Sequence, residues 1–463
     1  MMSSVIQLVS EWGSYDTWIV ITAALAAIAC ALPGNYLLLR RQSLLGDALS
    51  HAVLPGIVAG YLTWNAVEHS GWLPVSQAAG IRHLVLFGGA ALSGLLCVLL
   101  AEWTQRWGRI DAGSALGVVF TTFFAVGLLL IRQAADQAHI DPSCVLYGNL
   151  ELIVLDRIPG TPIPRAALIN GLAVLINLSL WIVFYKELQL AAFDPGYAET
   201  IGIRASRLNY GSTMATAMTV VAAFETVGSI LVIAMLIVPV ATARLLTDRL
   251  PTMITVSVIV AAASAVLGYG GALLLPGPLF ASLGYPGVED AGMAGMMALA
   301  SGGLFLLALI AGPRYGLLRR SWDHLWWQVQ VAADDILGVL FRQAESAPAG
   351  PPVSWKQLTE LLSHSRWIIA LARRRLERAT LIQSQAGGWE LTDAGRTRAQ
   401  ELVRSHRLWE AFLAQRFRVP EGRVHASAEK VEHYLGESLR GQLADELQQS
   451  TEDPHGRAIP PER

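Results

Sequence analysis

The feature that most constrains this fold is a series of long segments with no charged residue, or with only one. A helix that crosses a bilayer needs about 20 mainly apolar residues. Of the 463 residues, 53% are hydrophobic and only 15% are charged, and the charges are crowded towards the C-terminal third. The candidate spans are Trp18–Leu39, Leu84–Ala101, Ala112–Ile131, Ala166–Tyr185, Leu208–Ala243, Thr252–Val288 and Ala291–Gly312. The sequence therefore predicts an all-α polytopic membrane domain.

Arginines in the short connections predict how these spans are oriented. They occur at Arg40–Arg41, at Arg106 and Arg109, at Arg244 and Arg249, and at Arg319–Arg320. Because basic residues favour the cytoplasmic side, we expect these connections and everything after the last span to be cytoplasmic. A double crossing by Leu208–Ala243 gives nine spans with the N-terminus outside, and a single tilted crossing gives eight. The predicted membrane domain covers residues 1–320.

A change in composition near Ser321 predicts a soluble C-terminal part. The chain becomes rich in Arg, Glu, Gln and Ser there. The segment VSWKQLTELLSHSRWIIALARRRLERATLI, followed by QSQAGGWELT, is typical of a winged helix-turn-helix. We expect this mainly α cytoplasmic domain over residues 321–400 and a further helical domain over residues 401–463.

The second helix of this motif carries three consecutive arginines, Arg373, Arg374 and Arg375. They could face nucleic acid phosphates, as in DNA-binding relatives of this fold. They could equally form an ordinary solvated helix face. A domain tethered to a membrane protein can hardly search a chromosome, so we do not expect nucleic acid as a partner.

Three ionisable residues lie within apolar segments, where charge is costly and therefore usually functional. Asp47 and His51 are four residues apart in RRQSLLGDALSHAVLPG, so they share one helical face. A carboxylate and an imidazole on one face suit a divalent cation such as manganese, iron or zinc, although a helix cap and a packing histidine would have the same spacing. Glu225 either faces a translocation path, pairs with a buried partner or marks a break between half-spans.

A stronger signal for metal binding lies near the C-terminus, where imidazoles and carboxylates recur at helical spacing. These residues are His406, Glu410, His425, Glu429, Glu432 and His433. At ~100° per residue, the last four fall within an arc of about 100° on one helix. A solvated face would also carry glutamates, but it would seldom concentrate His with Glu and exclude Lys from these positions. Oxygen and imidazole donors without thiolate favour manganese or ferrous iron over a structural zinc site.

The sequence contains no motif for catalysis. A G-x-x-x-x-G-K-[ST] loop that could cradle nucleotide phosphates does not occur, and neither does a nucleophile motif. Cys30, Cys97 and Cys144 lie far apart without a Cys-x-x-Cys pair. We therefore predict that the chain is not an enzyme.

Residues 15–320 resemble the permease subunits of the zinc, manganese and iron ABC importer family. The resemblance is carried by RRQSLLGDALSHAVLPG and then, in the expected order, by RIDAGSALG, LYGNL, FDPGYAETIG, LIVPVATARLLT and AGPRYGLL. It implies that Asp47 and His51 line the metal path. Glu225 stands where the family more often carries an uncharged polar residue, so the resemblance assigns it no role.

The same resemblance implies partners and a location. A cytoplasmic loop would dock on a separate ATP-binding subunit that hydrolyses ATP, and the residues of the loop would include Phe193, Asp194, Pro195, Ala198 and Gly202. An extracytoplasmic metal-binding protein would deliver the ion, and a second permease chain, identical or related, would complete the pathway. The expected location is the bacterial inner membrane, in contact with lipid.

The segment Asp334–Pro460 is similar to metal-dependent repressors of the diphtheria toxin repressor and manganese transport regulator type. GWELTDAGRTRAQELVRSHRLWEAFL, HASAEKVEHYLGESL and DPHGRAIP carry this similarity. It implies that residues 401–463 form a metal-binding and dimerisation domain, in which all six His and Glu residues match metal ligands. Glu429 stands where manganese-type members also have glutamate, and Asp335 or Asp334 would supply a ligand from the first helix. The two resemblances together imply Mn²⁺, with Fe²⁺ and Zn²⁺ as alternatives.

The leading interpretation is an import permease for manganese whose cytoplasmic domain senses metal and provides feedback. One alternative is a membrane-tethered, metal-responsive DNA-binding regulator, but a mere anchor would not need the full set of permease segments. Another is a zinc or iron importer whose C-terminal domain is purely structural and holds two chains together.

Overall fold

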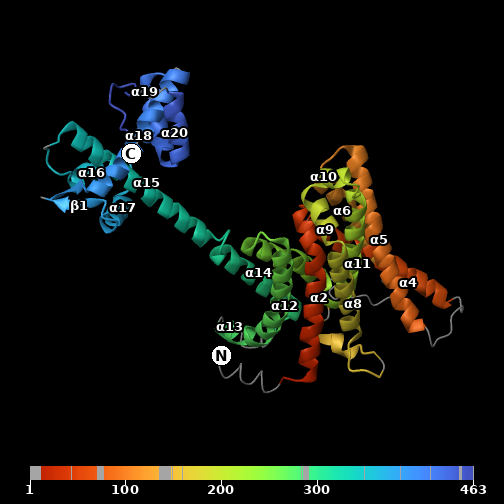
Figure 1. Ribbon diagram of the computed structural model, residues 1–463. Coiled ribbons are helices and arrows are strands. Elements are labelled where there is room, and N and C mark those ends of the chain that lie inside the picture. Colours follow the sequence, from red (N-terminus) through yellow and green to blue (C-terminus); the bar gives the residue numbers. More distant parts are fainter. Residues whose placement is uncertain are drawn as a thin grey trace. The chain divides into compact units, whose positions relative to one another are not determined.

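The computed structural model describes the chain except for residues 1–11, 43, 70–77, 135–147, 149, 159, 283, 285–290, 349, 386, 418, 448–450 and 462–463. The chain divides into two compact units, Met1–Arg319 and Arg320–Arg463 (Figure 1). The finer division at residue 400 stays a prediction, and residue 400 lies inside a continuous helix, Asp393–Phe417.

The first unit is built from helices that run mostly alongside one another. They are α2 (Ser14–Leu39), α3 (Leu44–Ala52), α4 (Leu54–His69), α5 (Ala78–Gly108), α6 (Ala112–Ala134), η2 (Leu150–Leu155), α8 (Arg165–Val183), α9 (Tyr185–Phe193), α10 (Pro195–Thr200), α11 (Ala205–Leu246), α12 (Leu250–Leu274), α13 (Pro276–Ser282) and α14 (Met293–Ala311). Seven helical stretches among the described residues are long and apolar enough to cross a membrane. The prediction of an all-α polytopic membrane domain is confirmed.

Helix α11 explains why the number of spans was ambiguous in the sequence. Its 42 residues are interrupted at Gly228, which has φ 74° and ψ 167°, values outside the helical region. A positive φ of this size is accessible to glycine without strain. The predicted choice between eight and nine spans therefore depends on how the two parts of α11 cross the membrane, and the count stays a prediction.

Close packing in the membrane unit depends on small residues of α2. Ala23, Ala26 and Ala31 are completely buried. A Cβ at Gly34 would lie 2.0 Å from the carbonyl oxygen of Leu236 on α11, so only glycine allows this approach. Small residues bring helix backbones together in membranes, where no hydrophobic effect drives association between helices.

Buried amide and hydroxyl groups also join the membrane helices. The pairs are Asn35 with Ser257 at 2.9 Å, Asn170 with Thr226 at 2.9 Å and Asn177 with Thr219 at 2.7 Å. Large apolar side chains on the outer faces remain exposed; examples are Leu99, Val118, Leu129, Leu172 and Leu306. Polar pairs inside and leucines outside are expected of a protein whose solvent is lipid.

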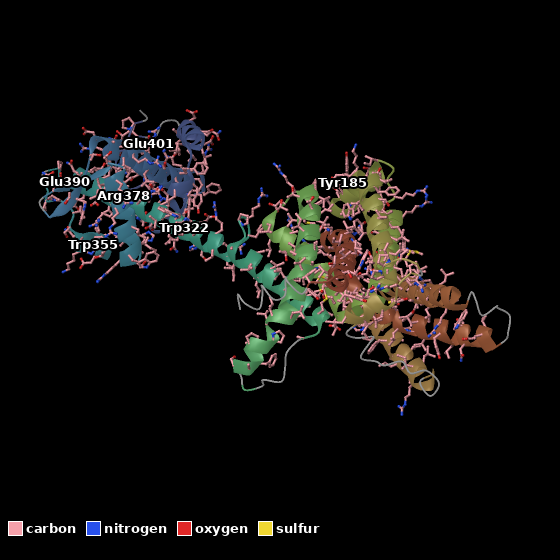
Figure 2. The ribbon with its side chains drawn as sticks, turned by 90° about the horizontal axis from the view of Figure 1, so that it is seen from below. Tyr185, Trp322, Trp355, Arg378, Glu390 and Glu401 are labelled. Carbon is pink, nitrogen blue, oxygen red and sulfur yellow. The ribbon has the colours of Figure 1, made fainter. Side chains whose placement is uncertain are left out.

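The second unit begins with a winged helix-turn-helix, as predicted. Its elements are α15 (Leu317–Ser346), α16 (Trp355–Leu361), α17 (Arg366–Arg378), β1 (Ile382–Gln385) and β2 (Gly388–Leu391). Ser354 caps α16, and Gln357 completes a capping box. Strands β1 and β2 form an antiparallel wing in which Ile382 faces Leu391. Figure 2 labels Trp355 at the start of α16, Arg378 at the end of α17 and Glu390 in the wing.

The rest of the second unit is helical. Its elements are α18 (Asp393–Phe417), α19 (Glu421–Val431), the 3₁₀ helix η3 (Glu432–Tyr434) and α20 (Glu437–Glu446). A closing segment follows, in which Glu452 and Ala458 form a β-bridge. The predicted fold class, a membrane domain followed by a winged helix and a helical domain, is thereby confirmed.

Candidate metal centres and coupling helix

A cluster of two imidazoles and one carboxylate joins α18 to α19, and we call it the histidine cluster. It consists of His406, Glu410 and His425. Glu410 Oε1 lies 3.1 Å from His406 Nε2 and 2.9 Å from His425 Nδ1. The two ring nitrogens are 3.0 Å apart, so all three donor atoms converge on one point. Spacing along α18 aligns His406 with Glu410, and the packing of α19 adds His425.

Glu410 is the electrostatic centre of the histidine cluster. Its side chain is 2% exposed. Burial by itself would raise the pKa of Glu410, but hydrogen bonds and charge from His406 and His425 outweigh this effect and lower the pKa from 4.5 to about 2. The carboxylate is therefore ionised at neutral pH. One carboxylate and two imidazoles are a donor set that fits a divalent transition metal.

His455, which we did not predict as a ligand, also approaches this cluster. Its Nε2 lies 3.8 Å from Glu410 Oε1. The turn is held by Asp453, whose Oδ1 accepts hydrogen bonds from the backbone N–H groups of His455 and Arg457. The motif DPHGRAIP contained this histidine, but it lies far from His406 in the sequence and shares no periodicity with it.

A second group of donors, which we call the aspartate cluster, consists of Asp334, Asp335, His364 and His433. His433 Nδ1 is 3.5 Å from Asp334 Oδ2, and His433 Nε2 is 3.5 Å from Asp335 Oδ1. His364 Nε2 lies 2.7 Å from Asp335 Oδ2. Two carboxylates with imidazole are donors that suit manganese. Asp334 and Asp335 were both weighed as first-helix ligands, whereas His364 was not predicted.

The structure separates donors that the sequence placed on one helix face. Helix α19 ends at Val431, and the 3₁₀ turn η3 follows at Glu432. This turn changes the angular spacing, and His433 faces α15 while His425 faces α18. Glu429 is exposed, and the side chain of Glu432 lies outside the described residues. The roles of both glutamates stay predictions.

The arginines of the second helix are mostly engaged inside the fold. Arg373 lies over the rings of Trp355 and Trp389, at 5.6 and 4.9 Å from their centroids. Arg375 lies 5.5 Å from the ring centroid of Trp326. Because such cation–π contacts restrain the guanidinium groups, they favour the interpretation of a structural rather than a phosphate-binding helix.

In the membrane unit, Asp47 and His51 are close together on α3, with His51 Nε2 3.5 Å from Asp47 Oδ1. His51 also contacts two rings of α6, those of Phe120 and Phe124. Both ionisable side chains are partly exposed, at 39% for Asp47 and 29% for His51, so they are open to an ion or to a partner. Glu225 belongs to α11, but its side chain lies outside the described residues.

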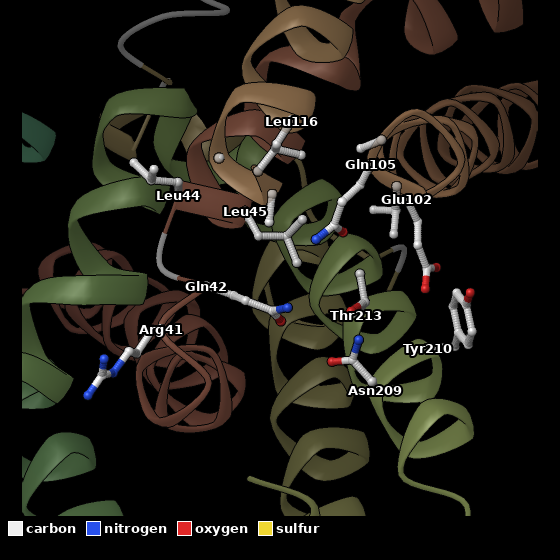
Figure 3. A pocket seen from close by; sticks show the side chains of 14 residues that line it. Arg41, Gln42, Leu44, Leu45, Glu102, Gln105, Leu116, Asn209, Tyr210 and Thr213 are labelled. Atoms are coloured by element: carbon white, nitrogen blue, oxygen red, sulfur yellow. The ribbon is translucent and has the colours of Figure 1, made fainter. Parts of the chain in front are cut away.

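A cavity of about 150 Å³ adjoins the N-terminal end of α3 (Figure 3). The Oε1 atom of Gln42 and the Oδ1 atom of Asn209 are buried beside it, with no hydrogen-bond partner among the described residues. Figure 3 shows the Arg41 guanidinium turned away from these amides. On the other side, Glu102 is paired with Arg106 at 2.8 Å. The cavity is thus lined by two neutral amide oxygens, one from the segment before α3 and one from α11.

The predicted coupling loop contains a short helix, α10. Asp194 caps it by accepting a hydrogen bond from the Tyr197 N–H at 2.9 Å, and Pro195 occupies its first turn. Ala198 is buried against Ala191 and Ala205, and Gly202 ends the segment with φ +87°. Phe193 is 64% exposed beside this helix. The segment is therefore a firmly seated helix with an apolar outer surface.

A multi-pass helical unit with an ionisable pair, joined to a unit with two clusters of metal donors, defines a membrane transport protein with an attached metal-binding domain. The chain belongs to the ABC 3 transport family, whose model matches residues 15–278. Residues 392–461 match the metal binding and dimerisation domain of the iron dependent repressor. Both resemblances inferred from the sequence are confirmed.

Relatives named as transport proteins are similar over about two thirds of the chain. The manganese transport system membrane protein MntD of Bacillus subtilis is 33% identical over 311 residues, which are 66% of this chain and 96% of the relative. The zinc transport system membrane protein TroD of Treponema pallidum is 35% identical over 65% of this chain and 75% of the relative. PsaBC from Streptococcus pneumoniae, solved in complex with Fab, has a TM-score of 0.53 at 25% identity and covers 69% of this chain and 100% of that chain.

These relatives are membrane proteins of transport systems for divalent metals. The chain is accordingly a multi-pass permease of the metal ABC transport type, and the expectation of a transport subunit is confirmed at that level. The repressor-type domain supports metal sensing.

Proposed function

We propose that this chain is the permease of an ATP-driven importer whose cargo is manganese, and that its C-terminal unit is a cytoplasmic sensor of the same ion. The observation that supports the proposal is that one chain holds two different kinds of donor arrangement suited to a divalent metal. Asp47 and His51 form a sparse pair in the membrane unit. The histidine and aspartate clusters are richer donor sets in the second unit. A site with only two protein donors suits brief binding of an ion in transit. A site with three or four donors suits longer retention of the ion.

The membrane pair would bind the ion only briefly. Two ligands leave most of the coordination sphere to water or to a second permease chain, so binding is weak enough for release. The buried amide oxygens of Gln42 and Asn209 would then accept the partly hydrated ion as it leaves α3. Fe²⁺ and Zn²⁺ share these donor preferences and are the alternative cargoes; one cited relative is named for manganese transport and the other for zinc transport.

The conformational change driven by ATP would be transmitted to the ion path through α10. Phe193, Tyr197 and Ile201 are each at least half exposed, which gives the segment an apolar surface of the kind that binds a partner protein. We propose that an ATP-binding subunit docks there. An extracytoplasmic metal-binding protein would deliver the ion, and a second permease chain would complete the pathway.

Feedback requires that the resting and active states of the transporter differ in their affinity for regulatory metal. Metal at the histidine cluster would hold α18 to α19, and metal at the aspartate cluster would hold α15 to η3. We propose that this occupied state slows uptake when manganese is plentiful.

The test is uptake of radioactive manganese by bacterial cells that produce the full chain with an ATP-binding subunit, at low and at high manganese. We expect uptake at low manganese that zinc inhibits less than manganese itself does, and a fall in initial rate after preloading with manganese. The double variant His406→Ala, His425→Ala should still take up manganese, but its initial rate should no longer fall after preloading. His324→Ala, an exposed histidine outside both clusters, is the matched control. Uptake of zinc alone would refute manganese as cargo, and an unchanged response in the double variant would refute feedback.

A further inference from the structure

A hydrogen bond within the aspartate cluster connects α15 to the turn of the helix-turn-helix. His364 lies in the turn between α16 and α17, and its Nε2 is 2.7 Å from Asp335 Oδ2 on α15. The two side chains are only 24% and 17% exposed. The other oxygen of Asp335, Oδ1, is 3.5 Å from His433 Nε2. One carboxylate thus stands between two imidazoles from different segments.

The turn that carries His364 is fixed by the core on both sides. Leu362 and Ile368 are buried, at 9% and 6% exposure, and they belong to the same core cluster as Ile336, which adjoins Asp335. Ser365 caps α17 with its backbone. Because apolar packing sets the position of this turn, His364 reaches Asp335 from a rigid base.

A carboxylate that binds metal through one oxygen is commonly oriented by a donor on its other oxygen. His364 donates to Oδ2, and this leaves Oδ1 directed towards His433. Asp334 has a different partner, because Gln330 Nε2 lies 3.3 Å from both of its oxygens. Each aspartate is therefore supported by its own donor, and the donor for Asp335 is the one that comes from the helix-turn-helix.

We infer that His364 is a positioning residue that presents Asp335 Oδ1 to a divalent metal at the aspartate cluster, and that it thereby ties metal binding to the turn of the winged helix. The inference rests on the proposed metal-sensing function. A hydrogen-bond donor at this position supports metal affinity, and a side chain of similar size without a donor does not.

The experiment compares the full chain with His364→Leu and His364→Gln in detergent, by titration with Mn²⁺ followed by electron paramagnetic resonance of the free ion. Leucine fills the space without a donor, and the amide of glutamine can still donate to Asp335. We expect His364→Leu to weaken one class of manganese sites by about 10- to 100-fold, the usual effect of removing such a partner, and His364→Gln to restore most of it. The histidine cluster shares no residue with this one, so its class of sites should be unchanged in both variants.

Manganese binding by the unaltered chain tests the proposed sensing function, and the two variants test the role of His364. If the unaltered chain binds no manganese, the proposed sensing function fails. If it binds manganese and both variants bind equally well, His364 only packs and the inference is overturned. Equal loss in the leucine and glutamine variants, with the histidine cluster still occupied, would also overturn it, because the hydrogen bond would not be the cause.

Discussion

At the scale of single residues, Glu410 carries the largest described electrostatic perturbation in the C-terminal unit. Its pKa is lowered to about 2 in the folded chain, from the ordinary 4.5. A carboxyl whose pKa falls on folding stabilises the fold above its unfolded pKa, and this stabilisation is lost as pH falls through the folded value. We predict that metal-free protein loses local stability in α18 and α19 between about pH 4.5 and pH 2.

The measurement is hydrogen exchange of peptides from α18 and α19, corrected for the intrinsic effect of pH. Protection should decline across that window in the unaltered chain. Glu410→Gln, which cannot ionise, should show lower protection at neutral pH and a flat profile below pH 4.5. A decline of equal size in the glutamine variant would show that another group is responsible.

Asp47 supports a second prediction at this scale. Asp47→Asn keeps the shape of the side chain and removes the charge that attracts a divalent cation. We expect manganese uptake to fall by more than about 10-fold, because even outer partners of a metal ligand have effects of this size. Glu68→Gln, an exposed carboxylate at the end of α4, is the control and should leave uptake unchanged. Normal uptake by Asp47→Asn would exclude the pair from the ion path.

The sequence predicted the residues of the histidine cluster but not all of their partners. His406 and Glu410 are visible because they lie four apart on one helix. His364 and His455 approach the clusters from a turn and from the closing segment, through tertiary packing that no local period reveals. The distribution of the six His and Glu residues also could not be predicted, since it depends on the 3₁₀ turn at Glu432.

At the scale of helices, the contact between α2 and α11 depends on the absence of a side chain at Gly34. A methyl group there would lie 2.0 Å from a backbone carbonyl, and backbone cannot rotate away as a side chain can. We predict that Gly34→Ala destabilises the membrane unit by about 1–3 kcal/mol or more, the usual cost of overpacking. The measurement is the thermal unfolding midpoint in detergent.

Gly303→Ala in α14 is the matched control, because nothing lies within 4 Å of a Cβ at that position. Alanine in an open helical position is expected to be neutral or stabilising. A similar midpoint for both variants would show that α2 and α11 do not need this approach.

The closing segment is held to two helices by the buried guanidinium of Arg407. Arg407 binds both carboxylate oxygens of Glu345 on α15 and the Ala458 carbonyl, and its side chain is 3% exposed. Its hydrogen bonds lower the pKa of Glu345. We predict that Glu345→Ala destabilises the C-terminal unit by about 1.5–3 kcal/mol, the usual effect of losing hydrogen bonds to a charged group, because Glu345 is partly exposed and Asp453 stays near Arg407.

The control for this change is Arg416→Ala, which removes an exposed ion pair with Glu446 and should cost at most about 1 kcal/mol. Limited proteolysis of the second unit distinguishes the two variants, because the less stable Glu345→Ala chain should be cut faster than Arg416→Ala. Equal resistance of both variants would show that Asp453, which lies near Arg407, compensates for Glu345.

At the scale of the whole molecule, the proposed transport and sensing functions fall on the two compact units, Met1–Arg319 and Arg320–Arg463. We predict that a chain ending at Arg319 imports manganese at a rate similar to the full chain and no longer slows after preloading. Initial uptake rates at low and high external manganese are the measurement. Loss of all uptake, together with loss of the paired assembly on size-exclusion chromatography, would favour the alternative in which the second unit holds two permease chains together.

The network around Arg407 also has a consequence for biosynthesis. The ribosome makes the membrane helices first and residues 453–458 among the last of this sequence. Until those residues emerge, the buried guanidinium lacks the Ala458 carbonyl and the Asp453 carboxylate, and His455 cannot approach Glu410. The membrane unit is therefore synthesised before the contacts around Arg407 and Glu410 can form. Proteolytic removal of residues 453–458 would take away the same contacts again.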